Sequence, residues 1–152
     1  MFMRSDGNRE RVYFGQTVAP WTDYQWQVAT DTLTQARELS RGGGAEFIVL
    51  YIPRKYRIYR DQIEVEAGAR IASWGIAPLP EALSSWCAAN DIPFIDTTPL
   101  LTKAVMQGIH PYFVDDVHWN GTGHNIAADA VTAFLVKHEM FPFRSGVETS
   151  KP

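Results

Sequence analysis

The sequence predicts an α/β domain built on a parallel sheet, because apolar strands and amphipathic helices alternate along the chain. Residues 45–52 (AEFIVLYI) form a nearly continuous apolar run with turn residues at both ends, typical of a strand covered on both faces of such a sheet. A second short buried strand is predicted at residues 92–95. The order strand, helix, strand, helix is that of doubly wound domains, whose sites lie at the carboxyl ends of the strands.

Terminal residues locate the helices. The first is predicted at residues 23–41, where apolar positions recur every three or four residues and Gly42, Gly43 and Gly44 follow. The remaining helices are expected near residues 79–90, where Pro78 or Pro80 would lie close to the first turn, and then at residues 100–108 and 123–138. Between the two strands, residues 54–68 read as a polar crossover that is helical from 59 to 67, and residues 11–18 read as a strand or small hairpin.

Composition sets limits on the class of protein. We expect one domain over residues 1–152, with residues 1–10 and 144–152 irregular. A net charge of −3 gives no electrostatic basis for binding nucleic acid or an anionic membrane. The single cysteine, Cys87, excludes an internal disulfide and a multi-thiolate metal site, and it fits the apolar stripe of its helix.

The sequence has no apolar run close to the roughly 20 residues that span a bilayer. Its first residues lack the apolar region of a signal peptide. The sequence therefore does not define the cellular compartment, and an exported or periplasmic parent protein is one of the options.

The segment from Val114 to His124 (VDDVHWNGTGH) carries most of the chemistry in the chain. An aspartate two or three residues before a histidine, on a loop at a helix entrance, can accept a hydrogen bond from Nδ1 and leave Nε2 as a base. The sequence therefore predicts His118 as a general base with either Asp115 or Asp116 as its orienting carboxylate. No matching nucleophile is evident elsewhere in the chain.

The residues after His118 have two alternative interpretations. Asn120 and Thr122 are preferred N-cap types for the last helix, while Trp119 and Asn120 are also candidates for binding substrate. His124 falls in the first helical turn, where packing beneath the loop is expected. Lys55 and Arg57 could bind an anionic sugar or a carboxylate, but a solvated surface after a strand is the favoured interpretation.

The block Asp115–Asn120, followed by Gly123-His124 and Ala127-Ala128, resembles the last conserved block of the SGNH (GDSL-type) hydrolases. The segment Phe47–Tyr59 (FIVLYIPRKYRIY) is similar to segments of SGNH-like proteins of polysaccharide O-acetylation. The resemblance implies a three-layer α/β/α flavodoxin-like sheet and acyl ester hydrolysis or acyl transfer on an O-acylated carbohydrate or small ester, without a cofactor. Asp115 lies three positions before His118, which is the spacing usual for this family. Asp116 lies two positions before His118 and fits the Asp-x-His-Trp variant of related glycan acyltransferases. Asp115 is slightly favoured.

The chain also departs from this family. A Gly-Asp-Ser block is missing, and Ser5-Asp6-Gly7-Asn8 has similar residues in another order without a preceding apolar strand. The resemblance then implies the C-terminal portion of a longer domain, with its sheet incomplete at the N-terminus and its nucleophilic serine outside this chain. We expect the isolated chain to be inactive or nearly so, and to self-associate through an exposed sheet edge.

Two other classes of function remain open at this point. The missing nucleophile block favours a non-catalytic α/β module that binds a glycan or a protein. A metal-dependent hydrolase would use the nearby imidazoles and carboxylate of His110, His118, His124 and Asp115, although their spacing matches no strong ligand motif. We therefore predict no metal site.

Overall fold

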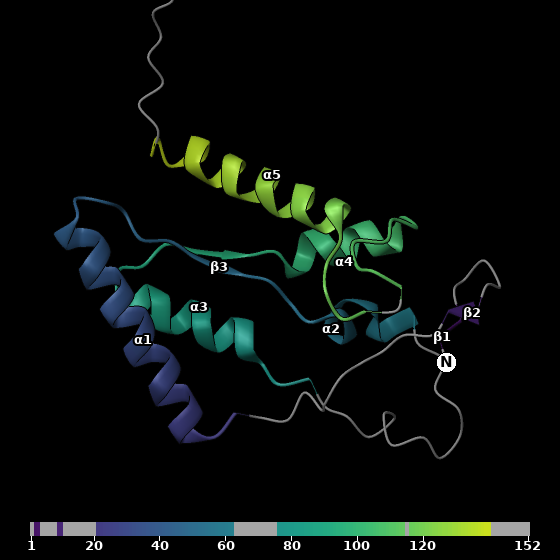
Figure 1. The fold of residues 1–152 in the computed structure, drawn as a ribbon, viewed down its shortest axis with the longest axis horizontal. Coiled ribbons are helices and arrows are strands. Elements are labelled where there is room, and N and C mark those ends of the chain that lie inside the picture. The colour runs from purple at the N-terminus through teal and green to yellow at the C-terminus, as the bar shows by residue number, and fades with distance from the viewer. Residues whose placement is uncertain (1, 4–8, 11–20, 63–75, 115, 141–152) are drawn as a thin grey trace, which may run out of the picture.

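The computed structural model describes residues 2–3, 9–10, 21–62, 76–114 and 116–140. The predicted strand at residues 11–18, the C-terminal tail and Asp115 lie outside the described residues. Figure 1 shows long helices on both sides of a short parallel strand pair. The helices and strands in chain order are β1 (Phe2–Met3), β2 (Arg9–Glu10), α1 (Asp23–Gly42), β3 (Val49–Tyr51), α2 (Lys55–Tyr59), the 3₁₀ turn η1 (Arg60–Gln62), α3 (Leu79–Ala89), β4 (Phe94–Asp96), α4 (Thr98–Met106) and α5 (Gly121–Lys137).

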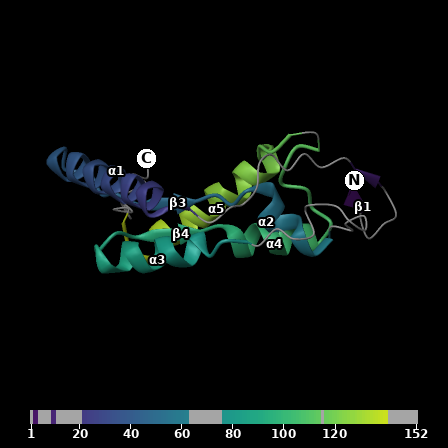
Figure 2. The same ribbon diagram turned by 90° about the horizontal axis from the view of Figure 1, so that it is seen from below.

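The sheet that positions the site is the parallel pair β3–β4, in which Val49 is opposite Phe94 and Tyr51 is opposite Asp96. Parallel strands need a crossover between them, and α2 and α3 lie on that connection. Helix α5 lies on one face of the strand pair, and α1 and α3 lie on the other (Figure 1). Seen from below, α1 and α3 flank the strands (Figure 2), and Arg37 of α1 donates to the Asn90 carbonyl at the end of α3. The layers are therefore helix, sheet and helix, as the sequence predicts.

The core of the described residues lies beyond the carboxyl ends of the strands, where α2, α4 and the start of α5 meet. The central cluster consists of buried side chains from α2, α4 and the loop that follows α4, namely Ile58, Tyr59, Leu101, Val105 and Tyr112. The partly buried side chains of Trp119 and Ile126 pack against it. The Tyr59 and Tyr112 rings meet edge to face with centroids 6.2 Å apart. This packing fixes the end of the sheet at which a site is expected.

Helix boundaries follow from local sequence. Thr22 caps α1 in a capping box: its hydroxyl accepts from the Gln25 N–H, and the Gln25 side chain accepts from the Thr22 N–H. At the start of α4, Oδ1 of Asp96 accepts a hydrogen bond from the Thr98 N–H. The predicted helices at 23–41, 79–90, 100–108 and 123–138 agree with α1, α3, α4 and α5 to within about two residues.

Three expectations need correction. The strand predicted at 45–52 is confined to Val49–Tyr51 and is only half-buried, because the space beside it is open in the described part of the chain. The crossover predicted to be polar begins as helix α2 at Lys55, and four of its five residues are buried because they pack against α4. Residues 1–10, expected to be irregular, include the antiparallel pair β1–β2.

Candidate active-site loop

The candidate site is a loop that leaves the core at Tyr112 and returns at Trp119. These two residues form an antiparallel bridge, and the Phe113 N–H donates to the His118 carbonyl at 3.0 Å. At the base of the loop, the Asn120 N–H donates to the Pro111 carbonyl at 2.9 Å. The loop is therefore closed by backbone hydrogen bonds, and His118 and Asp116 project from it.

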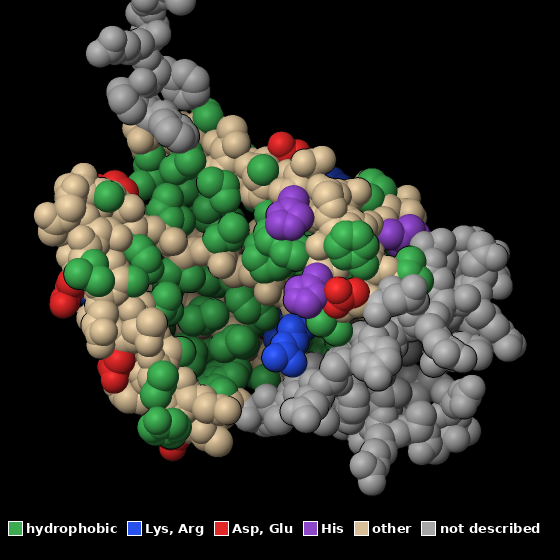
Figure 3. Space-filling view, viewed as in Figure 1, with side chains coloured by type: hydrophobic (Ala, Val, Ile, Leu, Met, Phe, Trp, Pro, Cys, Tyr) green, Lys and Arg blue, Asp and Glu red, His purple; other side chains and the backbone are tan. Residues whose placement is uncertain are grey.

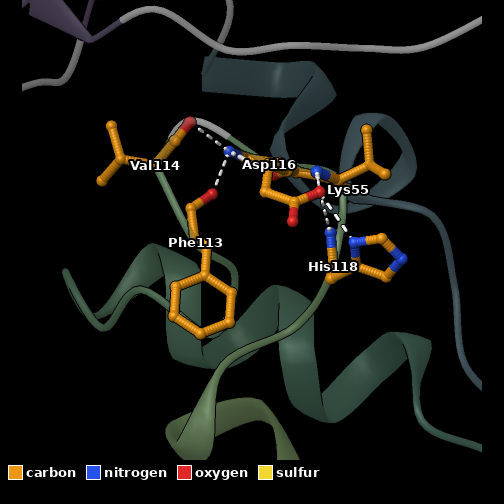
Figure 4. A network of polar contacts seen from close by, with 6 residues as sticks. Lys55, Phe113, Val114, Asp116 and His118 are labelled. Carbon is orange, nitrogen blue, oxygen red and sulfur yellow. Dashed lines mark hydrogen bonds and ion pairs between the residues drawn. The ribbon is translucent and has the colours of Figure 1, made fainter.

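Asp116 and His118 form a hydrogen-bonded pair within this loop. Nδ1 of His118 lies 2.7 Å from Oδ1 of Asp116, and the two side chains are 73% and 51% exposed, respectively. A proton on Nδ1 donated to the carboxylate fixes the tautomer in which Nε2 is the basic nitrogen. Figure 4 shows Nε2 on the side of the ring away from Asp116. The arrangement suits a general base.

The carboxylate of Asp116 is held by its own turn. Its Oδ1 also accepts hydrogen bonds from the backbone N–H groups of Val117, at 2.5 Å, and His118, at 3.3 Å. The hydrogen bond from the His118 ring holds the pKa of the Asp116 carboxyl below its ordinary value, and the two backbone N–H groups act in the same direction. Asp116 is therefore an anion at neutral pH, as an orienting group must be.

Lys55 is buried beneath the loop, which corrects the expectation of a solvated surface after β3. Only 4% of the residue is exposed. Its Nζ donates to the carbonyl oxygens of Phe113 at 2.5 Å, Val114 at 2.8 Å and Asp116 at 3.2 Å (Figure 4). Arg57, on the same short helix, donates to the Ala77 carbonyl. Both cations are thus engaged with backbone carbonyls.

Sequence reasoning missed Lys55 as part of the site. A signal was present, because Lys55 lies next to Tyr56, Ile58 and Tyr59, which are large residues that a solvated crossover would not expose together. Those neighbours are buried, and Lys55, on the same short helix, is buried together with them.

Asn120 connects the loop to α5. Its Oδ1 accepts from the N–H groups of Thr122 and Gly123, which caps the helix, and its Nδ2 donates to the carbonyls of His110 and Tyr112. The predicted capping role of Asn120 is confirmed. A role of Asn120 in binding substrate stays a prediction. A substrate would have to compete for a side-chain amide that already makes four hydrogen bonds within the protein.

Trp119 lies between the core and the loop surface. Its ring stacks on the His124 ring with centroids 4.0 Å apart, which agrees with the expectation that His124 packs against the loop. Gly123 is buried below, and a Cβ there would collide with the Pro111 carbonyl and lie 2.9 Å from Trp119 Cβ. The glycine is needed for this close approach. The role of Trp119 in binding substrate stays a prediction.

The second candidate carboxylate, Asp115, lies outside the described residues, so the structure gives geometry for Asp116 alone. The described residues contain no group of three or more His, Cys, Asp or Glu side chains that could hold a metal ion. Cys87 is fully buried, as its apolar stripe predicts, and burial raises the pKa of its thiol. Among the helices described, none is both long and apolar enough to cross a membrane.

An apolar groove opens on the same face as the loop. It has a volume of about 480 Å³ and is lined by Trp26 and Leu33 of α1, Val49 and Tyr51 of β3, and Leu83 of α3. Among the described strands, β3 pairs with β4 alone, and all three residues of β3 line this groove. Figure 3 shows the green hollow beside histidine and acidic side chains.

A parallel sheet between helices, with an Asp-x-His pair on the loop before the last helix, defines a protein of the SGNH hydrolase-like class. A family model described as "SGNH hydrolase-like domain, acetyltransferase AlgX" matches residues 17–148. Because the match extends over most of the sequence, the chain belongs to this family, which confirms the resemblance drawn from the sequence.

The fold is also similar to a solved structure, the O-acetyltransferase domain of AlgJ from Pseudomonas putida. The TM-score is 0.63 at 17% sequence identity, and the match covers 82% of this chain and 44% of that chain. The chain thus spans less than half the length of this structural relative. No match was found among curated proteins. The SGNH-like α/β fold predicted from the sequence is confirmed.

Proposed function

We propose that the chain supplies the general base and its orienting carboxylate to an acyl-transfer site acting on an O-acetylated carbohydrate or small ester. The observation that carries the proposal is the 2.7 Å contact between His118 Nδ1 and Asp116 Oδ1, with the imidazole exposed. Membership of an acetyltransferase-type SGNH family and a fold shared with an O-acetyltransferase domain support acetyl as the acyl group and an oxygen as its carrier. A carbohydrate carrier rests on the similarity of Phe47–Tyr59 to segments of SGNH-like proteins of polysaccharide O-acetylation.

In the proposed reaction, Nε2 of His118 accepts the proton of a hydroxyl nucleophile as its oxygen attacks the acyl carbon. The tetrahedral intermediate collapses by breaking the bond to the leaving alkoxide, which takes the proton back from His118. A sugar hydroxyl or water then attacks the acyl group with the same proton transfers in reverse. Asp116 keeps the ring in the required tautomer and stabilises the imidazolium.

The nucleophile is the missing part of this mechanism. No hydrogen bond joins His118 Nε2 to a hydroxyl group within the described residues. The proposal therefore assigns the serine to a segment outside the described residues.

Acetyl-ester cleavage by the isolated chain tests this assignment. We expect wild-type protein and His118→Ala to cleave an aryl acetate at the same low rate, because an imidazole without a nucleophile contributes little. A high rate lost in His118→Ala, with a sulfonyl fluoride labelling one serine, would place the nucleophile within the chain. His124→Ala is the matched control, since its imidazole is also exposed and stacks on Trp119.

Substrate class is tested separately, by binding. An O-acetylated oligosaccharide should shift the NMR signals of the His118 and Trp119 rings, whereas the same oligosaccharide after deacetylation should shift them far less. Equal shifts with both ligands would instead support a non-catalytic glycan-binding module. That second candidate function is favoured by the absence of a paired hydroxyl beside His118 among the described residues.

The proposal includes self-association through the groove. Strand β3 lies between apolar side chains of α1 and α3 and pairs with β4 alone among the described strands. A strand edge without a partner beside an apolar surface tends to pair with another copy. The occupant proposed is a second copy of this chain, and its test is given in the Discussion.

A further inference from the structure

We propose that Lys55 is a positioning residue whose buried ammonium group holds the loop in the conformation that joins Asp116 to His118. Its hydrogen bonds to described residues include those to the carbonyl oxygens of Phe113, Val114 and Asp116, which lie two to five positions before His118 in the loop. The catalytic meaning of this role rests on the proposed function, but the geometry can be tested without any substrate.

Burial of Lys55 needs a specific compensation. Lysine is almost never fully buried without partners, because removing an ammonium group from water is costly. An ammonium group has three N–H donors, and here three backbone carbonyls of one loop accept from it. Hydrogen bonds to a charged donor are among the stronger ones in proteins, so the conformation that aims all three carbonyls at one point is favoured.

The side-chain contact between Asp116 and His118 adds little to the stability of this conformation. Both side chains are more than half exposed, and exposed ion pairs contribute little to stability because water and salt screen them. The contacts of Lys55, by contrast, are buried below the loop. The buried contacts of Lys55 and the exposed contact between Asp116 and His118 therefore belong to the same loop.

Lys55 also ties the loop to the sheet. It is the first residue of α2, four residues after the end of β3, and its partners lie 58, 59 and 61 residues further along the chain. The Tyr112 hydroxyl donates to the carbonyl of the buried Pro53, close to the same strand end. The place of the His118 ring is thus set relative to the carboxyl end of β3, where sites of such sheets lie.

Lys55→Met separates this role from simple packing. Methionine keeps most of the apolar stem of lysine and removes the ammonium group. We expect the Asp116 carboxyl pKa, followed by its ¹³C signal, to rise to the value found in His118→Ala. Amide exchange at Val117 and His118 should become at least about tenfold faster in the folded protein, since a charge-assisted contact is lost. Lys103→Met, at an exposed lysine of α4, should change neither quantity.

A folded Lys55→Met protein with an unchanged Asp116 pKa and unchanged exchange would overturn the proposal, even if its melting temperature had fallen. If this variant does not fold, the wild-type protein provides the test. The Nζ protons of Lys55 should exchange slowly enough for NMR detection at neutral pH, and those of Lys103 should not; equally fast exchange at both would refute the inference. Neither measurement depends on activity, so failure of the acyl-transfer proposal would be recognised separately.

Discussion

Oδ1 of Asp116 lies 2.7 Å from Nδ1 of His118, and the same oxygen accepts the backbone N–H groups of Val117 and His118. The carboxylate thus orients the imidazole and organises the turn that carries it. Among the described residues, Asp116 is the carboxylate in contact with the His118 ring, at the spacing of the Asp-x-His-Trp variant.

The first prediction concerns the ionisation of Asp116. Its pKa in the folded protein should lie below the ordinary value of about 3.9, because the His118 ring donates to the carboxylate. A lowered pKa means that the pairing stabilises the folded loop above the unfolded pKa, and that this contribution is lost as the pH falls through the folded pKa. A ¹³C titration of the carboxyl carbon measures it, and in His118→Ala the midpoint should move upward. Identical midpoints would contradict the hydrogen bond.

The second prediction concerns the close approach of α5 to the loop. Gly123→Ala should lower the free energy of unfolding by about 1–3 kcal/mol, because the new Cβ would press on the Pro111 carbonyl and on Trp119. Gly121→Ala is the matched control in the same turn, since a Cβ there meets nothing within 4 Å. It should be neutral or stabilising by up to about 1 kcal/mol. Urea unfolding of both variants gives the comparison, and equal effects would count against the packing described.

The third prediction concerns Asn120. Asn120→Ala should reduce the free energy of unfolding by about 1–3 kcal/mol, since the helix cap and two hydrogen bonds to the carbonyls of His110 and Tyr112 are lost together. Asn120→Asp keeps the capping oxygen and removes the amide donors, so an intermediate loss is expected. Asn125→Ala, at an exposed position of α5, should cost less than about 0.5 kcal/mol. Thermal unfolding measures these stabilities, and an Asn120→Asp variant as stable as the wild type would contradict the role given to the amide donors.

The fourth prediction concerns self-association. Leu33→Glu places a carboxylate among the apolar side chains that line the groove, and burying an unpaired charge is costly. The variant should therefore be more monomeric than the wild type in sedimentation velocity at equal concentration. Leu39→Glu is the control, because Leu39 lies on the same helix but is 79% exposed and does not line the groove. A wild-type chain that is monomeric at every concentration would refute the groove as a contact between copies.

Local sequence was sufficient for most of the helices and for the chemistry of the loop. Thr22, Pro80 and Asn120 lie at helix starts where capping or a fixed backbone angle is preferred, and these preferences act within a few residues. The pairing of an aspartate with His118 is equally local, since the partners are two positions apart in the sequence. Strand length was less predictable, because residues 45–48 have apolar character but no pairing partner within the described residues.

The sequence by itself determined the alternation of helices and strands, the cap at Asn120 and the close spacing of an aspartate and His118 in the loop. Tertiary structure alone decided that Lys55 is buried and that β3 borders an open groove. It also placed the three carbonyls of the loop above Lys55. The physical reason is range: caps and turns depend on neighbours in the chain, whereas a buried ammonium group depends on acceptors 58 to 61 residues away. Only folding brings those acceptors to Lys55, and with them the conformation in which Asp116 meets His118.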